Sequence, residues 1–260
     1  MMRLEGRTAI VYGGAGALGG AAARAFARVG ARVHLVGRTQ AKLDAAAAEI
    51  GGEAHAAALD VLDLAAVERH AAEVASTGAI DVALVAVGIP HVQGVALLDL
   101  RAADFLHPID SYMRAHFNVA KAVGPHMMRQ REGAVITIST QASVLGFPGA
   151  LGFGTACAAI EGFTRHLAAE LGAHGARAVC IRSDAIPEAS AQGSHSQAVF
   201  APLAAKQGIS VQQMLAESAK MKPLPRMATL EEFGACAVFA ASVPAMTGAV
   251  INITAGAAYD

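Results

Sequence analysis

A glycine-rich run near the N-terminus has the residue types and spacing to bind the phosphates of a dinucleotide. It reads Gly-Gly-Ala-Gly-Ala-Leu-Gly-Gly over residues 13–20, and it joins the β-branched apolar run Thr8–Tyr12 to an alanine-rich helical stretch. A strand that ends on glycines and turns directly into a helix presents backbone N–H groups and the positive helix end to a pyrophosphate. A tight turn without a ligand is the alternative. The residues expected to form this site are Gly13, Gly14, Ala17, Leu18 and Gly19.

The end of the next apolar run indicates which dinucleotide is preferred. Arg32–Val36 is followed by Gly37, Arg38 and Thr39, at the position where a carboxylate would hydrogen-bond the adenosine ribose of NAD. A neutral glycine followed by an arginine leaves room and positive charge for a 2′-phosphate. We therefore expect NADP(H) as the cofactor, with NAD(H) less favoured, and we expect Arg38 and Thr39 to contact it.

Later in the chain, three residues are candidate proton donors. His91 follows the apolar run Ile80–Gly88, at the carboxyl end of a strand, where open α/β sheets bind their ligands. Asp184 follows a later apolar run, and His195 lies in the polar segment after it. A histidine in such a site can donate a proton near neutral pH. The alternatives are a surface-loop role for each residue, or a substrate that carries its own phenol or enol.

The segment from Gly133 to Gly172 carries several recognisable motifs. It contains Gly-Ala-Val-Ile-Thr-Ile-Ser-Thr, then Gly-Phe-Pro-Gly, then Ala-Ala-Ile-Glu-Gly-Phe-Thr-Arg. In this it resembles the catalytic segment of the short-chain dehydrogenase/reductase family, in which a Tyr-x-x-x-Lys pair supplies the proton. The resemblance places Phe153 and Cys157 at those two positions. Phenylalanine has no proton to give, and a thiol is a weak donor without a fixed charge.

The resemblance also implies roles for other residues. Asn118 matches an asparagine that anchors a water chain, and Thr140 matches a serine whose hydroxyl polarises the carbonyl oxygen. The alternatives are an Asn118 that only bonds a strand backbone and a Thr140 that only ends a strand. With His91, these two complete the set of candidate catalytic residues. Further dinucleotide contacts implied by the resemblance are Asp60, Val61, Val87, Gly88 and Ile186.

Acidic residues in two places qualify the cofactor assignment. Asp60 or Asp63 could simply cap a helix instead of facing the adenine. Glu188 stands where the family has a hydroxyl near the phosphates. A carboxylate there repels a pyrophosphate unless it points away.

Apolar strands alternate with helical stretches along the whole chain, which predicts a parallel α/β sheet covered on both faces. The resemblance specifies a single Rossmann-type, doubly wound domain over residues 1–260, with about seven strands in the order 3-2-1-4-5-6-7. Residues 183–225 correspond to the family's substrate-binding loop. The expected helices are Leu18–Val29, Gln40–Ile50, Leu64–Ser76, Phe105–Arg131, Phe153–Leu171 and Leu230–Ser242.

Composition excludes several classes of partner. With 260 residues, 54% of them apolar, and a net charge of −1, the chain has no electrostatic footprint for nucleic acid or an anionic membrane. Three cysteines and ten histidines show no metal-ligand spacing, so we expect no metal, no structural disulfide and a cytoplasmic location. The uncharged run Phe233–Tyr259 is interrupted by Pro244 and by Thr247-Gly248, so we expect no membrane span. The resemblance implies a homotetramer, or a homodimer that is half of one.

The hypothesis that best accounts for these features is an NADP(H)-dependent oxidoreductase. It would reduce a carbonyl, or a conjugated double bond, of a small organic substrate without the family's tyrosine and lysine. Two alternatives stay open: a catalytically silent dinucleotide-fold protein that binds a ligand, and a non-redox dehydratase or isomerase that reuses the cleft.

Overall fold

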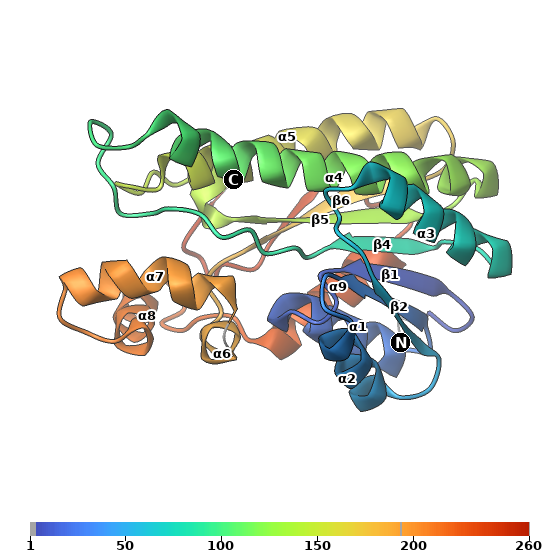
Figure 1. Cartoon of the computed structure of the whole chain (residues 1–260), viewed down its shortest axis with the longest axis horizontal. Helices are drawn as coiled ribbons and strands as arrows, with labels where there is room; N and C mark the ends of the chain where they lie inside the picture. The colour runs from blue at the N-terminus through green and yellow to red at the C-terminus, as the bar shows by residue number, and fades with distance from the viewer. Residues whose placement is uncertain (1–3, 193, 260) are drawn as a thin grey trace.

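Seven parallel strands form one twisted sheet with helices on both faces (Figure 1). The computed structural model describes residues 4–192 and 194–259. The strand order β3-β2-β1-β4-β5-β6-β7 confirms the predicted topology. The strands are β1 (Thr8–Tyr12), β2 (Arg32–Gly37), β3 (Ala54–Ala58), β4 (Val82–Val85), β5 (Ala134–Thr140), β6 (Arg177–Ser183) and β7 (Val250–Asn252).

The central strands are buried because both faces of the sheet are covered. Every residue of β1, β4 and β6 is buried, whereas β3 at the edge is an alanine-rich strand with partly exposed residues. Strand β4 is shorter than the apolar run Ile80–Gly88 suggests. Its partner β1 ends at Tyr12, which pairs with Val85, so the residues that follow leave the sheet and enter the region beyond the strand ends.

Two layers of helices enclose the sheet (Figure 1). On one face lie α3 (Leu64–Thr77), α4 (Ala102–Gln130) and α5 (Leu151–Gly172); on the other lie α1 (Ala17–Arg28), α2 (Gln40–Ile50) and α9 (Leu230–Ser242). Each layer has its own apolar core, because alternate side chains of a strand point to opposite faces. Val67, Val119 and Val123 pack on the first face, and Phe26 and Phe233 pack on the second.

Three short helices stand apart from these layers, beyond the ends of the strands (Figure 1). They are α6 (Pro187–Ala191), α7 (His195–Lys206) and α8 (Val211–Lys220), and they fall within the predicted substrate-binding segment. A buried ion pair between Lys222 and Asp184 fastens the end of this segment to the loop after β6. Among the described residues, no helix has both the length and the apolar character required to cross a membrane.

The fold gathers three histidines that are far apart in the sequence. The rings of His34 and His55 stack with centroids 4.7 Å apart, and His70 lies edge-on to His34 at 6.1 Å. Within the described chain, Nε2 of His34 and Nδ1 of His70 are buried without hydrogen-bond partners. Burial, reinforced by the neighbouring histidines and Arg32, lowers the pKa of His34 to about 4, and burial also lowers the pKa of His70.

We expect this cluster to make the fold sensitive to acid. Histidines of the unfolded chain titrate near pH ~6.5, so below that pH the unfolded state binds more protons than the folded state. Stability is therefore complete above that range and is lost as the pH falls toward the lower folded-state pKa. Chemical denaturation at about pH 7.5 and about pH 5 should show the loss.

The variant His34→Phe should reduce this loss by up to ~2 kcal/mol, because pH 5 lies ~1.5 units below the pKa of an unfolded-state histidine and one unit corresponds to ~1.4 kcal/mol. The control His174→Asn alters an exposed histidine and should keep the full pH dependence. An equal pH dependence in all three proteins would contradict the assignment to the cluster.

Candidate active site

A cavity of about 750 Å³ lies at the carboxyl ends of the strands, where open α/β sheets bind ligands. Its wall begins at the turn between β1 and α1 and passes the ends of β2 and β4. It then reaches the end of β5, the first turns of α5 and the helices α7 and α8. One cavity therefore connects most of the predicted dinucleotide residues with Thr140 and His91.

The glycine turn combines close packing with an open helix end. Gly16 is the N-cap of α1 and offers no side chain to the first N–H groups of the helix, which leaves them available to an anion. A Cβ atom on Gly13 would lie 2.4 Å from the Ala86 carbonyl oxygen, and one on Gly19 would lie 2.2 Å from the Gly13 carbonyl oxygen. Gly13, Ala17 and Leu18 line the cavity. Gly14 and Gly19 instead allow the turn to pack against its neighbours.

The end of β2 contributes two cations to the cavity rim. Arg38 and Thr39, both predicted from the sequence, line the cavity. Lys42 from the first turn of α2 lines it too. All three are exposed. Sequence analysis missed Lys42, which lies in the first turn of the helix that follows Arg38 and Thr39.

In the loop after β3, one aspartate caps a helix and the other lines the cavity. Asp63 is the N-cap of α3 and accepts the Ala66 N–H at 3.1 Å. Asp60 accepts the Leu62 N–H at 3.0 Å and lines the cavity together with Val61. Helix capping, the alternative role considered for Asp60, thus belongs to Asp63.

Glu188 points away from the cavity. Its Oε2 accepts the Leu230 N–H at 2.9 Å, at the start of α9, and the residue is not part of the cavity wall. The sequence-based objection to a pyrophosphate therefore loses its force. Val87, Gly88 and Ile186 do line the cavity.

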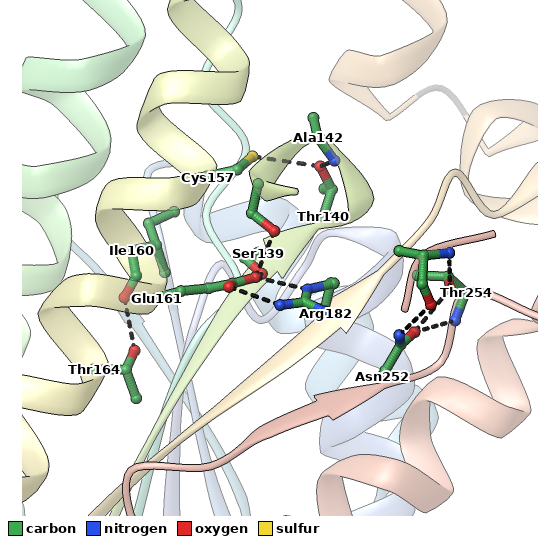
Figure 2. Close-up of polar contacts among 12 residues, drawn as sticks. Ser139, Thr140, Ala142, Cys157, Ile160, Glu161, Thr164, Arg182, Asn252 and Thr254 are labelled. Carbon is green, nitrogen blue, oxygen red and sulfur yellow. Dashed lines mark hydrogen bonds and ion pairs between the residues drawn. The ribbon is translucent and has the colours of Figure 1, made fainter. Parts of the chain in front are cut away.

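Phe153 and Cys157 lie in the cavity wall, and neither supplies a charge. The Phe153 ring stacks on His91 with centroids 4.4 Å apart and planes 8° from parallel. Cys157 is buried, with its Sγ 3.3 Å from Thr140 Oγ1 (Figure 2). Burial raises the pKa of the thiol to about 11, so Cys157 stays protonated at neutral pH.

The predicted proton donors are largely committed to other contacts. Nδ1 of His91 donates to the Ile89 carbonyl at 2.8 Å, and its Nε2 accepts from the Gln93 amide at 2.9 Å. Burial lowers the pKa of His91, so the ring is neutral with both nitrogens engaged. Asp184 accepts from Gln141 at 2.7 Å and pairs with Lys222. Burial lowers the pKa of His195 to about 4.

Asn118 and Thr140 differ in their access to the cavity. Asn118 Nδ2 donates to the Val61 carbonyl at 2.9 Å, and the residue is buried outside the cavity wall. Thr140 lines the cavity, and its Oγ1 also accepts the Ala142 N–H at 3.2 Å (Figure 2). The structure thus brings Thr140 and His91 to one cavity and places Asn118 behind it.

Residues 7–197 match the model of the short-chain dehydrogenase family. The chain belongs to that family. It is 31% identical to the oxidoreductase UcpA of Salmonella typhimurium, over 93% of this chain and 90% of that protein. It is 30% identical to the galactitol 2-dehydrogenase of Rhizobium johnstonii, over 98% and 96% of the two chains.

Solved structures agree with this membership. One short-chain dehydrogenase/reductase family protein superposes with a TM-score of 0.79 at 30% identity, covering 98% of each chain. Another, from Beutenbergia cavernae and provisionally assigned as an NAD(P)-dependent gluconate 5-dehydrogenase, holds NADP at low occupancy. It has a TM-score of 0.83 at 26% identity and also covers 98% of each chain. The family binds nicotinamide dinucleotides, and these relatives support a dehydrogenase or reductase function.

Two cavity residues from α4 were not predicted from the sequence. Tyr112 Oη accepts the Ile89 N–H at 3.3 Å, and His116 Nδ1 donates to the Tyr112 carbonyl at 2.7 Å. Both line the cavity, and His116 Nε2 is buried without a partner among the residues described. Their spacing of four on one helix face, shortly before Asn118, was the available signal.

A buried ion pair supports the floor of this family site (Figure 2). Glu161 of α5 receives Nε and Nη2 of Arg182 from β6 at 2.8 and 2.9 Å. Ser139 and Ser143 also donate to Glu161, each at 2.6 Å. Burial alone would raise the pKa of Glu161, but the hydrogen bonds from Arg182 and the serines outweigh it and hold the pKa below its ordinary value.

Replacing Glu161 with glutamine should destabilise the protein strongly. The change removes one partner of a buried pair and leaves the Arg182 charge uncompensated, which costs about 3–5 kcal/mol. Equilibrium denaturation measures the loss. The control Asp110→Asn breaks the exposed pair with Arg114 and should cost less than about 1 kcal/mol. Similar losses in both variants would show that the buried pair contributes no more to the free energy of unfolding than the exposed pair does.

Proposed function

We propose that the protein reduces a carbonyl, or a conjugated double bond, of an apolar small molecule with NADP(H), without the family's tyrosine and lysine. The observation that carries this proposal is the continuity of the cavity from the glycine turn and Arg38 to Thr140 and Phe153. A bound reduced dinucleotide would supply a hydride there.

The residues at one end of the cavity fit NADP(H). The uncapped start of α1 suits a pyrophosphate, and Glu188 is held elsewhere by the start of α9. Arg38, Thr39 and Lys42 offer two charges and a hydroxyl to a 2′-phosphate. The relative with bound NADP from Beutenbergia cavernae agrees with this preference.

The other end of the cavity suits an apolar and preferably aromatic substrate. The stacked rings of Phe153 and His91 present a flat wall, on which an aromatic group can stack. The Thr140 hydroxyl lines the cavity and would polarise a carbonyl oxygen there. The remaining wall is mostly apolar, with Ile89, Pro90, Phe147, Val199, Phe200, Leu203, Met214 and Met227.

A catalytically silent dinucleotide-binding protein is the second candidate function. It is favoured by the commitment of His91, whose two ring nitrogens are both hydrogen-bonded, and by the uncharged Cys157 thiol. The two functions differ in one measurement, because only a reductase oxidises NADPH when a carbonyl compound is added.

NADPH should bind more tightly than NADH. If Arg38 contacts the 2′-phosphate, its charge-assisted hydrogen bond is worth ~1.5–3 kcal/mol, and Arg38→Ala should remove most of the difference. Titration followed by nicotinamide fluorescence measures both affinities. The control Arg69→Ala alters an exposed arginine on α3, away from the cavity wall, and should keep the preference. Equal affinities in the unmodified protein would refute the NADP assignment, and no binding of either would refute both functions.

We also propose that the protein is a homotetramer, or a homodimer that is half of one. Helices α4 and α5 expose large apolar side chains, with Leu106 54%, Phe117 52% and Leu151 49% exposed. Such side chains on neighbouring helices suit a self-complementary contact around a twofold axis. Ala156 and Ala168 on α5 are buried within the chain, so only the exposed face of α5 is available to a partner.

Light scattering at micromolar concentration should therefore give the mass of four chains or of two. Phe117→Glu should shift the protein toward smaller species, because it places a charge in the contact. The control Met221→Glu alters an equally apolar residue, 82% exposed, in the segment after α8, and should not change the mass. A monomer in the unmodified protein would remove the proposal.

A further inference from the structure

A phenol from a different helix lies beside the positions of the lost catalytic pair. Tyr112 projects from α4 and lines the cavity. Its ring lies 6.4 Å from that of Phe153 and packs with Ala156 and Ile160 of α5. Ala156 precedes Cys157 in α5, and Cys157 lines the same cavity as Tyr112. The cavity thus retains one phenol next to both residues that replace the family's acid and its lysine.

The hydrogen bonds of this phenol leave its proton available. Tyr112 Oη accepts the N–H of Ile89 at 3.3 Å, so the oxygen uses one lone pair. Over residues 4–192 and 194–259, no acceptor for its O–H is found. A buried hydroxyl normally finds a partner for its hydrogen, and Tyr112 is part of the cavity wall, where a ligand could accept it. Within the described cavity wall, the other tyrosine is Tyr12, which stands at the glycine turn.

We propose that Tyr112 donates the proton to the carbonyl oxygen of the substrate, in place of a residue at position 153. This inference rests on the proposed reductase function. As the carbonyl carbon accepts a hydride from reduced nicotinamide, the C=O π pair moves onto oxygen. The Tyr112 O–H bond breaks to protonate that oxygen, giving an alcohol and a phenolate. Water returns a proton to the phenolate after the alcohol leaves.

The surroundings of Tyr112 favour this direction of transfer. Burial raises the pKa of its phenol, and the Ile89 N–H offsets part of that rise by stabilising the phenolate. A phenol of high pKa stays protonated at neutral pH, and it remains a stronger acid than the alcohol that forms, so reduction is supported. The reverse oxidation needs the phenolate and is disfavoured. The reduction rate should consequently be flat between about pH 6 and about pH 9.

A kinetic comparison separates this role from a structural one. Tyr112→Phe keeps the ring and removes only the hydroxyl. Tested with NADPH on deoxybenzoin, a monoketone, it should lower turnover by about 10²–10⁴-fold with little change in KM. On benzil, the diketone of the same skeleton, the loss should be smaller, because the developing oxyanion is less basic. Tyr259→Phe, at a residue 73% exposed, is the matched control and should act as the unmodified protein does. Equal losses on both ketones, or none, would overturn the proposal.

A binding measurement needs neither turnover nor NADPH. The chain has three tyrosines, so a fluorotyrosine-labelled protein should give three fluorine NMR signals, assignable with Tyr12→Phe, Tyr112→Phe and Tyr259→Phe. Deoxybenzoin added without NADPH should shift the Tyr112 signal saturably and leave that of Tyr259 in place. An unchanged Tyr112 signal at saturating ketone, with binding shown by calorimetry, would contradict the contact.

Together, the two measurements distinguish a failure of the Tyr112 role from a failure of the proposed reductase function. If the native protein oxidises NADPH but Tyr112→Phe is unimpaired, the reductase function stands and the role of Tyr112 is refuted. If native protein oxidises NADPH with neither ketone, the reductase function and the proton transfer are both refuted. A Tyr112 signal that then still shifts with deoxybenzoin would show the phenol to be a ligand contact of a binding protein.

Discussion

The buried pair of Glu161 and Arg182 is the constraint on which the reacting end of the cavity depends. It joins α5 to β6, and the serines that also donate to Glu161 join both to the end of β5 and the turn after it (Figure 2). Because a half-satisfied charge is far more costly than a complete pair, these elements keep one relative position. Phe153 and Cys157 occupy the first turns of the helix so fixed. The chain can thus vary the residues that do the chemistry while the frame around them persists.

Charge is compensated or suppressed at the reacting end of the cavity. Lys222 neutralises Asp184, and burial keeps the Cys157 thiol and the His195 imidazole uncharged at neutral pH. In the tyrosine–lysine arrangement of the family, an ammonium supplies a positive charge at this place. Here the polar groups of the cavity wall include the hydroxyls of Thr140 and Tyr112. Such neutral donors act more strongly in an apolar cavity than in water.

Features set by local sequence or implied by the family resemblance could be predicted, whereas side-chain contacts between distant segments could not. The strand order followed from a whole-chain resemblance, and the turn at Gly13 followed from a strand, glycines and a helix in succession. The direction of the Glu188 carboxylate depends on the start of α9, forty-two residues later. The pairing of Asp184 with Lys222 spans thirty-eight residues. Tyr112 escaped notice because a tyrosine on an apolar helix face is ordinarily part of a core, and only the fold places it beside residue 153.

The first residue of α7 packs against the loop that follows β4. A Cβ atom built on Gly88 would lie 2.3 Å from Nδ1 of His195, so the imidazole occupies the space that any other residue at position 88 would need. The two positions are therefore coupled through space. A larger residue at position 88 requires the His195 imidazole to move aside or a smaller side chain at position 195. Among descendants of a common ancestor, these two sites should change together, despite the 107 residues that separate them.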